Sequence, residues 1–208
     1  MPEREMARGA FVKDGQLHEL LYQALQTELG GVEVYETALR CVQNEELRSE
    51  FEEYHAQTTR HVEIVRGLLV SFGLDERAEP PGRKVVHYLG SSLVKAMEMA
   101  LSAGPPEAAE LVAAECVVLA ETKDHLNWEL LAEAAGHLRG AARQALEEAV
   151  REVESDEDEH LYHSSGWGRE LWMASLGLPA VLPPPEEQHH VKTAIGAARA
   201  KQAREEMV

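Results

Sequence analysis

Four long apolar stripes at helical spacing constrain the fold of this chain more than any other feature. In each stripe, apolar residues recur in steps of three and four, over residues 17–42, 51–72, 111–135 and 146–171. Residues three or four apart lie on one face of an α-helix, so each stripe predicts a helix with one buried face. Such helices bury these faces by packing against one another, which predicts an all-α bundle.

Glycine and proline residues set the limits of the expected helices. Gly73 and residues 80–82 follow the second stripe, and residues 104–106 precede the third. These residue types end helices, because proline lacks the amide proton and glycine favours turns. The expected helices span about 16–43, 46–73, 106–136 and 140–177, with a further helix or a crossover over 84–103 and a kink at 166–168.

The length and composition favour one helical domain with short additions at both ends. The 208 residues are enough for one sizeable core, and aromatic residues make up only 5%, as is common in helical proteins. We expect an N-terminal arm over 1–15, the bundle over 16–175 and a tail over 176–208. The tail contains three consecutive prolines and then a helix-capable segment, 187–206, which we expect to be appended to the bundle rather than part of its core.

The charge of the chain limits its partners. Twenty basic and 37 acidic residues give a formal net charge of −17, which argues against nucleic acid and anionic membranes and favours cations. The sequence shows neither an apolar targeting segment nor the roughly 20 apolar residues of a membrane span, so we expect a cytoplasmic protein. Cys41 and Cys116 lie 75 residues apart without a CxxC motif, and we expect two buried small side chains.

Ionisable side chains interrupt every stripe at positions where a buried residue is expected. They are Glu28, His61, Glu121, Glu157 and His160. A buried carboxylate needs a proton, a cation or a metal, because burying it unpaired costs several kcal/mol. Each residue alone has a plainer explanation: Glu157 and His160 have the spacing of a surface pair, and a lone histidine is more often an ordinary core residue.

The heights of these residues along the helices match. If the first two helices turn near Asn44, Glu28 and His61 lie 16 and 17 residues from that turn. If the last two helices turn near Gly140, Glu121 lies 19 residues before that turn, and Glu157 and His160 lie 17 and 20 residues after it. At a rise of 1.5 Å per residue, all five side chains meet roughly 25 Å from the turns, which is where helix bundles hold metals.

Three short segments resemble the ferritin-like superfamily of four-helix, carboxylate-bridged di-metal proteins. Glu28 with Tyr35 in ELGGVEVY, and Glu121 with Trp128 in ETKDHLNW, resemble the Glu-x6-aromatic segments of rubrerythrin-like helices. Residues 157–160 match the ExxH motif of the last helix. The third-helix region also resembles the stress-associated ferritin-like proteins of the YciF type.

The resemblance covers residues 16–175 and implies an up-down-down-up four-helix bundle with a long crossover between its second and third helices. It implies a dinuclear centre of iron or manganese, with zinc as an alternative, and a homo-oligomer that is a dimer or larger. The implied metal ligands are Glu28, His61, Glu121, Glu157 and His160.

The second helix departs from the family pattern, since Thr58 gives TxxH where the family has ExxH. A neutral hydroxyl cannot balance a divalent cation as a carboxylate does, so the site is one carboxylate short. His125 or His55 is a candidate replacement, because imidazole suits iron, zinc and manganese. Asp156 is the candidate acceptor for the free N–H of His160, which it would orient.

Two classes of function remain open. The first is a non-haem oxidoreductase or ferroxidase acting on iron, oxygen or peroxide, with a role in oxidative stress. Tyr35 is its candidate redox or proton donor, although a large aromatic on such a stripe more often only packs in the core. The second is a scaffold or stress-associated binding protein whose degenerate site holds one metal or none, and it explains Thr58 directly.

Overall fold

A computed structural model describes residues 12–208, and this part of the chain is all-helical, without strands. The helices are α1 (Asp14–Cys41), α2 (Glu45–Ser71), α3 (Pro81–Ala103), α4 (Pro106–His137), α5 (Gly140–Ser175), α6 (Pro185–Gln188) and α7 (Ala194–Ala203), followed by a 3-10 turn (Arg204–Glu206). The expected all-α bundle is therefore confirmed. Most of the expected N-terminal arm, 1–15, lies outside the described residues.

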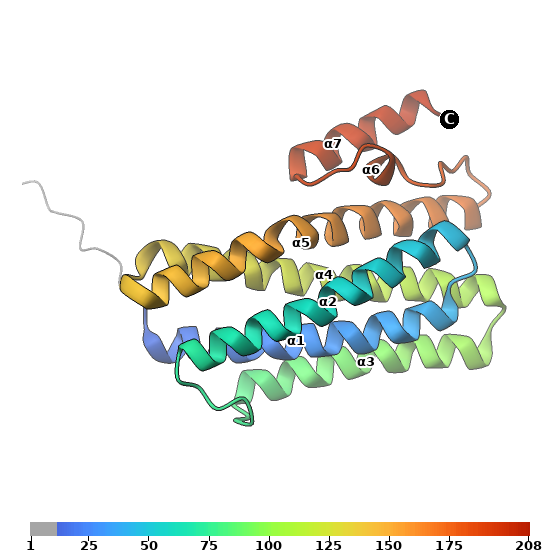
Figure 1. Cartoon of the computed structure of the whole chain (residues 1–208). Coiled ribbons are helices and arrows are strands. Elements are labelled where there is room, and N and C mark those ends of the chain that lie inside the picture. Colours follow the sequence, from blue (N-terminus) through green and yellow to red (C-terminus); the bar gives the residue numbers. More distant parts are fainter. Residues whose placement is uncertain (1–11) are drawn as a thin grey trace, which may run out of the picture.

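Four of the helices form a closed ring in the order α1, α2, α5, α4, in which each helix packs on the next. Figure 1 shows α1 and α5 running in one direction and α2 and α4 in the other. The segment expected as a helix or a crossover is α3, which packs outside the ring against α1 and α4. Gly30 of α1 and Gly90 of α3 lie in this contact, where a Cβ on Gly90 would lie 3.5 Å from the Gly30 Cα, an ordinary van der Waals distance.

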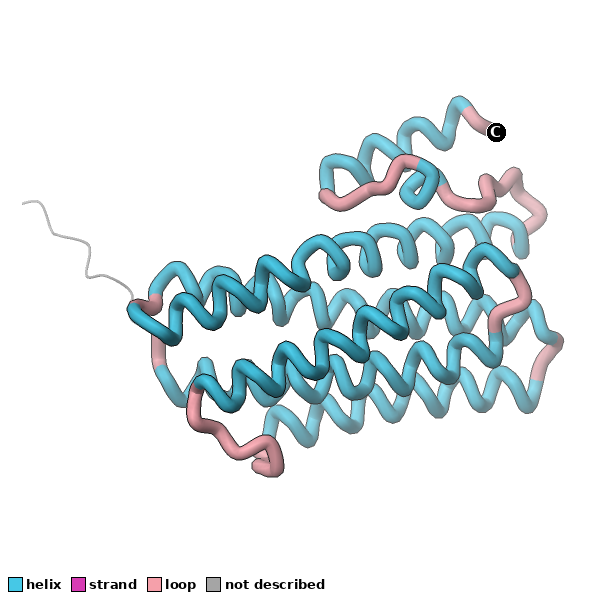
Figure 2. The backbone as a smooth tube through the Cα atoms, viewed as in Figure 1, coloured by secondary structure: helices cyan, strands magenta, loops and turns pink. Residues whose placement is uncertain are grey.

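The two expected turns lie where the sequence places them, and the loops are confined to helix ends (Figure 2). Asn44 caps α2, because its Oδ1 accepts the backbone N–H groups of Glu46 and Leu47 at 2.9 and 3.1 Å. Gly140 has a φ of +65°, which favours glycine, and begins α5. The helix α5 continues unbroken through residues 166–168, where a kink was expected.

Two apolar clusters fill the two halves of the ring, and ionisable residues lie between them. One cluster includes Leu21, Leu25, Val65, Leu131 and Val153, and the other includes Val34, Phe51, Met97, Val117 and Trp167. On α1, for example, Glu28 lies between Leu25 and Val34. Cys41 and Cys116 are buried and free, as expected. The bundle therefore carries a polar layer halfway along its length.

The tail packs on α5 through buried ion pairs. Arg169 donates two hydrogen bonds of 2.7 Å to the Glu186 carboxylate, and Arg204 donates one of 2.6 Å to the fully buried Glu170. Gly166 makes room for this contact, because a Cβ there would lie 2.7 Å from Glu186 Oε2. The tail is thus docked on α5, and none of its residues, 176–208, belongs to the buried apolar core of the bundle.

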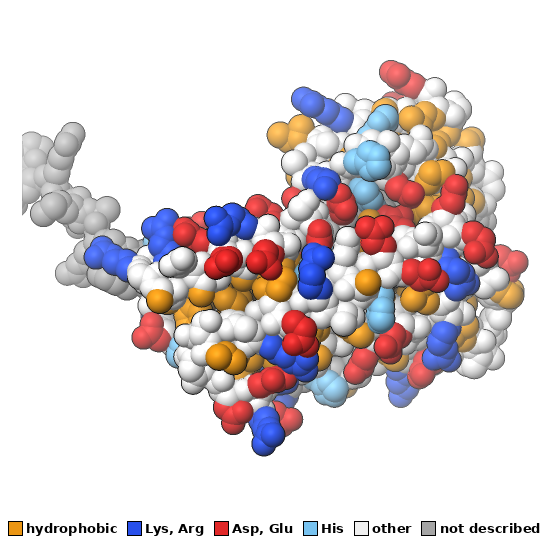
Figure 3. Space-filling model, viewed as in Figure 1, with side chains coloured by type: hydrophobic (Ala, Val, Ile, Leu, Met, Phe, Trp, Pro, Cys, Tyr) orange, Lys and Arg blue, Asp and Glu red, His pale blue; other side chains and the backbone are white. Residues whose placement is uncertain are grey.

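The helical part of the tail is shorter than the segment expected over 187–206. The helix α6 ends at Gln188, and α7 begins after Thr193, whose side chain accepts the Gly196 N–H at 3.0 Å. Acidic and basic side chains are interspersed over the face seen in Figure 3, so the negative charge is not gathered in one patch there. In the described part of the chain, none of the helices has both the length and the apolar character needed to cross a membrane.

Candidate metal centre

The five ionisable residues expected to meet mid-bundle do meet, and we call them the central cluster. They form two groups whose potential ligand atoms all lie within 4.8 Å of one another: Glu28, His61 and Glu157, and Glu121, Glu157 and His160. All five are at most 3% exposed. Glu157 belongs to both groups and so lies between the other four residues.

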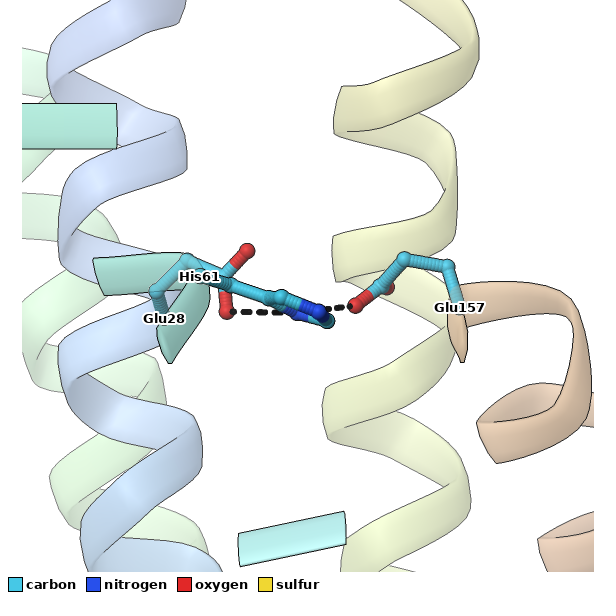
Figure 4. Close-up of side chains that lie close together, drawn as sticks. All are labelled: Glu28, His61 and Glu157. Atoms are coloured by element: carbon cyan, nitrogen blue, oxygen red, sulfur yellow. Dashed lines mark ion pairs between the residues drawn. The ribbon is translucent and has the colours of Figure 1, made fainter. Parts of the chain in front are cut away.

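Both histidines present Nδ1 to the carboxylates. His61 Nδ1 lies 3.1 Å from Glu157 Oε1 and 3.7 Å from Glu28 Oε2, so its ring stands between the two carboxylates (Figure 4). His160 Nδ1 lies 3.4 Å from Glu121 Oε2 and 3.8 Å from Glu157 Oε1. The two groups therefore repeat one arrangement, with an imidazole nitrogen, a carboxylate of its own and the shared Glu157.

The outer oxygens of two carboxylates are held by aromatic side chains. Trp128 Nε1 donates to Glu28 Oε1 at 2.8 Å, and the Tyr35 hydroxyl donates to Glu121 Oε1 at 2.7 Å. Tyr35 of α1 thus binds the glutamate of α4, and Trp128 of α4 binds the glutamate of α1. In each Glu-x6-aromatic segment the aromatic residue contacts the other helix, so the two segments hold α1 and α4 together. These bonds fix each carboxylate with its second oxygen turned toward the cluster.

The outer nitrogens of the histidines are held as well. His160 Nε2 lies 2.7 Å from Gln57 Oε1, and His61 Nε2 lies 3.2 Å from Asp156 Oδ2. Asp156 also pairs with Arg60. Asp156 was expected to orient His160, and this was wrong: it faces the histidine of the neighbouring helix, because the approach of α2 to α5 brings His61 and not His160 within its reach.

The inner atoms of the central cluster have no hydrogen-bond partner among the residues that the structure describes. They are Glu28 Oε2, His61 Nδ1, Glu121 Oε2, both oxygens of Glu157, and His160 Nδ1. None of these carboxylates pairs with a lysine or arginine of that part of the chain. Because buried polar atoms are nearly always paired, this convergence of unpaired atoms needs a cation or bound protons.

The pKa values of the carboxyls also indicate that the central cluster holds a cation or bound protons. Burial raises the pKa of Glu28 well above its usual range, and the charges of Asp124 and Glu157 raise it further. Burial, and then the charge of Glu121, raise the pKa of Glu157 to about 8. Without a cation these carboxyls therefore hold protons at neutral pH, and a metal ion would replace them.

Asp124 is a buried carboxyl that our sequence reasoning did not select. It is 4% exposed, lies one turn after Glu121, and has an Oδ1 without a hydrogen-bond partner in residues 12–208. Its carboxyl lies within hydrogen-bonding reach of Glu28, and burial raises its pKa. The i,i+3 spacing from Glu121 was the available signal, but the i,i+4 spacing of His125 competed with it.

The two histidines expected as replacements for the missing carboxylate lie elsewhere. His125 Nε2 is 2.9 Å from Asp158 Oδ1, and His55 Nε2 is 3.6 Å from Glu36 Oε1, so neither belongs to the two groups of potential ligands. Thr58 itself is buried, and a Cβ added at Gly31 of α1 would lie 3.1 Å from the Thr58 Cγ2. The threonine thus packs against α1.

Comparison of the chain with protein-family models, with curated proteins and with solved structures finds no match in any of the three. Any assignment of function therefore depends on the arrangement of the residues. Carboxylate oxygens and imidazole nitrogens that converge without partners are the donor set of a transition-metal site, and the hydrogen bonds behind them are those that orient metal ligands. The residues fit a metal.

Proposed function

We propose that the central cluster holds two divalent metal ions. The observation that carries this proposal is the contrast between outer and inner atoms: the outer atom of Glu28, His61, Glu121 and His160 is hydrogen-bonded, and the inner atom is not. Glu157 belongs to both groups, and both its oxygens are unpaired within residues 12–208, so it would help to hold both ions. Outer bonds of this kind orient ligands before the metal arrives.

Iron or manganese suits this donor set, and zinc is the alternative. An iron or manganese pair supplies redox chemistry toward oxygen or peroxide when bound. We therefore propose a non-haem oxidoreductase or ferroxidase that acts on ferrous iron, oxygen or peroxide. The ring of α1, α2, α5 and α4, with α3 in the connection between α2 and α4, supports a ferritin-like bundle.

Asp124 is the carboxylate that compensates for Thr58. In the ring, α2 and α4 lie opposite one another. A carboxylate on α4 therefore reaches, from across the bundle, the same central space that a glutamate at position 58 would reach from α2. Asp124, like His125 and His55, lies outside the two groups of potential ligands, but unlike them it is a buried carboxyl beside Glu28, and its Oδ1 has no partner within residues 12–208. Thr58, by contrast, fills space against Gly31. The proposed ligand set therefore has six members again, four carboxylates and two imidazoles.

Tyr35 is the aromatic side chain best placed to assist the chemistry. Its hydroxyl donates to Glu121 Oε1 at 2.7 Å, and the ring is fully buried. Burial, and then the charge of Glu121, raise the pKa of Tyr35 well above its usual range, so the phenol keeps its proton. Tyr35 thus holds Glu121 in position through a hydroxyl that stays protonated.

The proposal is tested by loading the protein, without a His-tag, with ferrous iron under anaerobic conditions and measuring metal per chain. We expect about two ions per chain for the wild type, near zero for Glu157→Ala, and an unchanged value for the exposed Glu152→Ala on the same helix. Oxygen uptake after loading then distinguishes an oxidoreductase from an inert metal protein.

Thr58 favours a second function, a scaffold or binding protein with the same fold and no dinuclear chemistry. In that case a wild-type protein that folds normally binds one ion or none. Folding is followed by circular dichroism in the same samples, so that loss of metal is not confused with loss of structure.

A further inference from the structure

A pocket between α4, α5 and the tail includes Glu157 of the central cluster in its lining. It has a volume of about 230 Å³, and the tail contributes Lys192 and Thr193 to the lining. Glu157 is 2% exposed, and both its oxygens lack partners within the described residues. A buried ligand with free atoms therefore faces a space that holds several water molecules.

The lining of this pocket is acidic. Glu129, Glu154 and Asp158 contribute carboxylates, and His125 lies with Nε2 2.9 Å from Asp158 Oδ1. His125 was a candidate metal ligand, but in the structure it lines this pocket and does not belong to the central cluster. An imidazole and several carboxylates around an open space attract a divalent cation.

The one lysine or arginine in the lining, Lys192, forms its ion pair with a carboxylate outside the pocket. Lys192 Nζ lies 2.5 Å from Glu159 Oε1 and 3.0 Å from Ser155 Oγ, both on α5. Its charge is therefore compensated by Glu159, which does not line the pocket. Four carboxylates and one lysine therefore line the pocket, and the tail contributes two of its lining residues.

We propose that this pocket is the entrance through which divalent cations reach Glu157, with His125 and Asp158 as their first contact. The inference depends on the proposed metal centre, because an entrance has no purpose without one. The volume admits a partly hydrated ion or a small molecule such as oxygen or peroxide. It also gives the tail a role, since residues 192 and 193 complete the wall.

A pair of matched tryptophan variants tests the proposal. Ala132 is exposed on α4 and lines the entrance, whereas Ser49 is exposed on α2 and lines a different acidic pocket, beside Glu50, that contains no residue of the central cluster. Cobalt(II) is the probe, since its visible absorption reports binding by imidazole and carboxylate ligands. The rate of absorbance change is measured after rapid mixing, and bound cobalt is measured at equilibrium.

We expect Ala132→Trp to slow cobalt uptake about tenfold or more and Ser49→Trp to leave it unchanged, with equal amounts bound at equilibrium. Asp158→Asn, which leaves the pocket open, also slows uptake and weakens its dependence on salt. Slower uptake in Ser49→Trp alone, or wild-type rates in both variants, would overturn the proposal. If the wild type binds no cobalt at all, the metal centre itself fails, and this outcome is distinct from an unchanged rate.

Discussion

Two polar clusters lie in this protein, one fully buried and one partly buried, and they differ in how their carboxylates are paired. The central cluster joins all four helices of the ring. The second, which we call the Glu50 cluster, consists of Glu50, Tyr54, His163, Trp167 and Glu187 and lies between α2, α5 and the tail. Both contain glutamate and histidine near a tyrosine and a tryptophan, so composition does not distinguish them.

Hydrogen bonding does distinguish them. Both oxygens of Glu50 are occupied: Tyr54 donates to Oε1 at 2.5 Å, with His163 Nδ1 at 3.2 Å, and Trp167 donates to Oε2. Burial acts to raise the pKa of Glu50, but the bonds from His163, Tyr54 and Trp167 outweigh it, and the pKa is lowered. His163 Nε2 and Glu187 Oε2 are the atoms of this cluster that remain unpaired within residues 12–208.

The central cluster has the opposite balance. Its aromatic partners bind only the outer oxygens, and the pKa values of Glu28 and Glu157 are raised by burial. A buried carboxylate is therefore not by itself a sign of a metal site. Burial also raises the pKa of Glu187 in the Glu50 cluster to about 8. What separates the two clusters is how many atoms are left free: Glu187 Oε2 and His163 Nε2 in the Glu50 cluster, against six converging atoms in the central cluster.

The largest expected effect is at Asp124. Asp124→Asn should reduce bound metal from about two ions to one per chain, because a neutral amide cannot balance the charge of the second ion. Thr58→Glu added to this variant should restore the second ion by returning a carboxylate to α2. Elemental analysis measures both values, and Asp158→Asn is the control. Two ions bound in Asp124→Asn would remove Asp124 from the ligand set.

The pH dependence of stability should have opposite signs without and with metal. The pKa of Glu157 is about 8 in the folded protein against an ordinary value of 4.5, so the folded state binds the extra proton between these values. The contribution of Glu157 to metal-free stability is therefore greatest below about pH 4.5 and falls, by up to several kcal/mol, as the pH rises to about 8. The metal-bound protein gains stability over the same range, because metal binds the deprotonated carboxylates.

Thermal unfolding in chelator and in excess manganese, from pH 5 to 8, measures both curves. A metal-free protein whose stability rises with pH would contradict the account of the central cluster.

Glu50→Gln should have an intermediate effect and act on stability alone. The substitution replaces one carboxylate oxygen, which accepts a hydrogen bond, with an amide NH₂ group, which donates. Either Trp167 or Tyr54 therefore loses its acceptor, at a cost of about 1–3 kcal/mol. Denaturant unfolding measures this loss. Metal per chain should stay at the wild-type value, and a variant that loses metal would show that the Glu50 cluster belongs to the metal-binding machinery.

The smallest expected effect is that of Tyr35→Phe. Removing the hydroxyl leaves Glu121 Oε1 unpaired and costs about 1 kcal/mol in the metal-free protein. The number of ions should be unchanged, while metal affinity falls about tenfold because Glu121 is less well oriented. Competition with a chelator measures the affinity, and Tyr54→Phe in the Glu50 cluster is the matched control that should keep the wild-type value.

The sequence predicted the features that depend on one helix or on one short turn. The stripes gave the helices of the ring to within about two residues at most ends, and counting from Asn44 and Gly140 brought all five cluster residues to one height. Both results follow from fixed helical geometry. The features that depend on how helices rotate against one another were not predictable in this way.

Asp124 and Asp156 illustrate the limit. The spacings i+3 and i+4 share a face, and only the rotation of α4 decides that Asp124 turns inward while His125 lines the outer pocket. Asp156 was assigned to the histidine on its own helix, but its actual partner, His61, comes from α2. The docking of the tail depends on Arg169 and Gly166 in the middle of α5, where no local sequence signal points to a distant segment.

The central claim is tested most directly by anomalous X-ray diffraction from crystals loaded with manganese(II). We predict two anomalous peaks about 3.5–4 Å apart, on either side of Glu157 and within reach of His61 and His160. The absence of a peak at Glu157, or a peak beside Glu50 alone, would contradict the account.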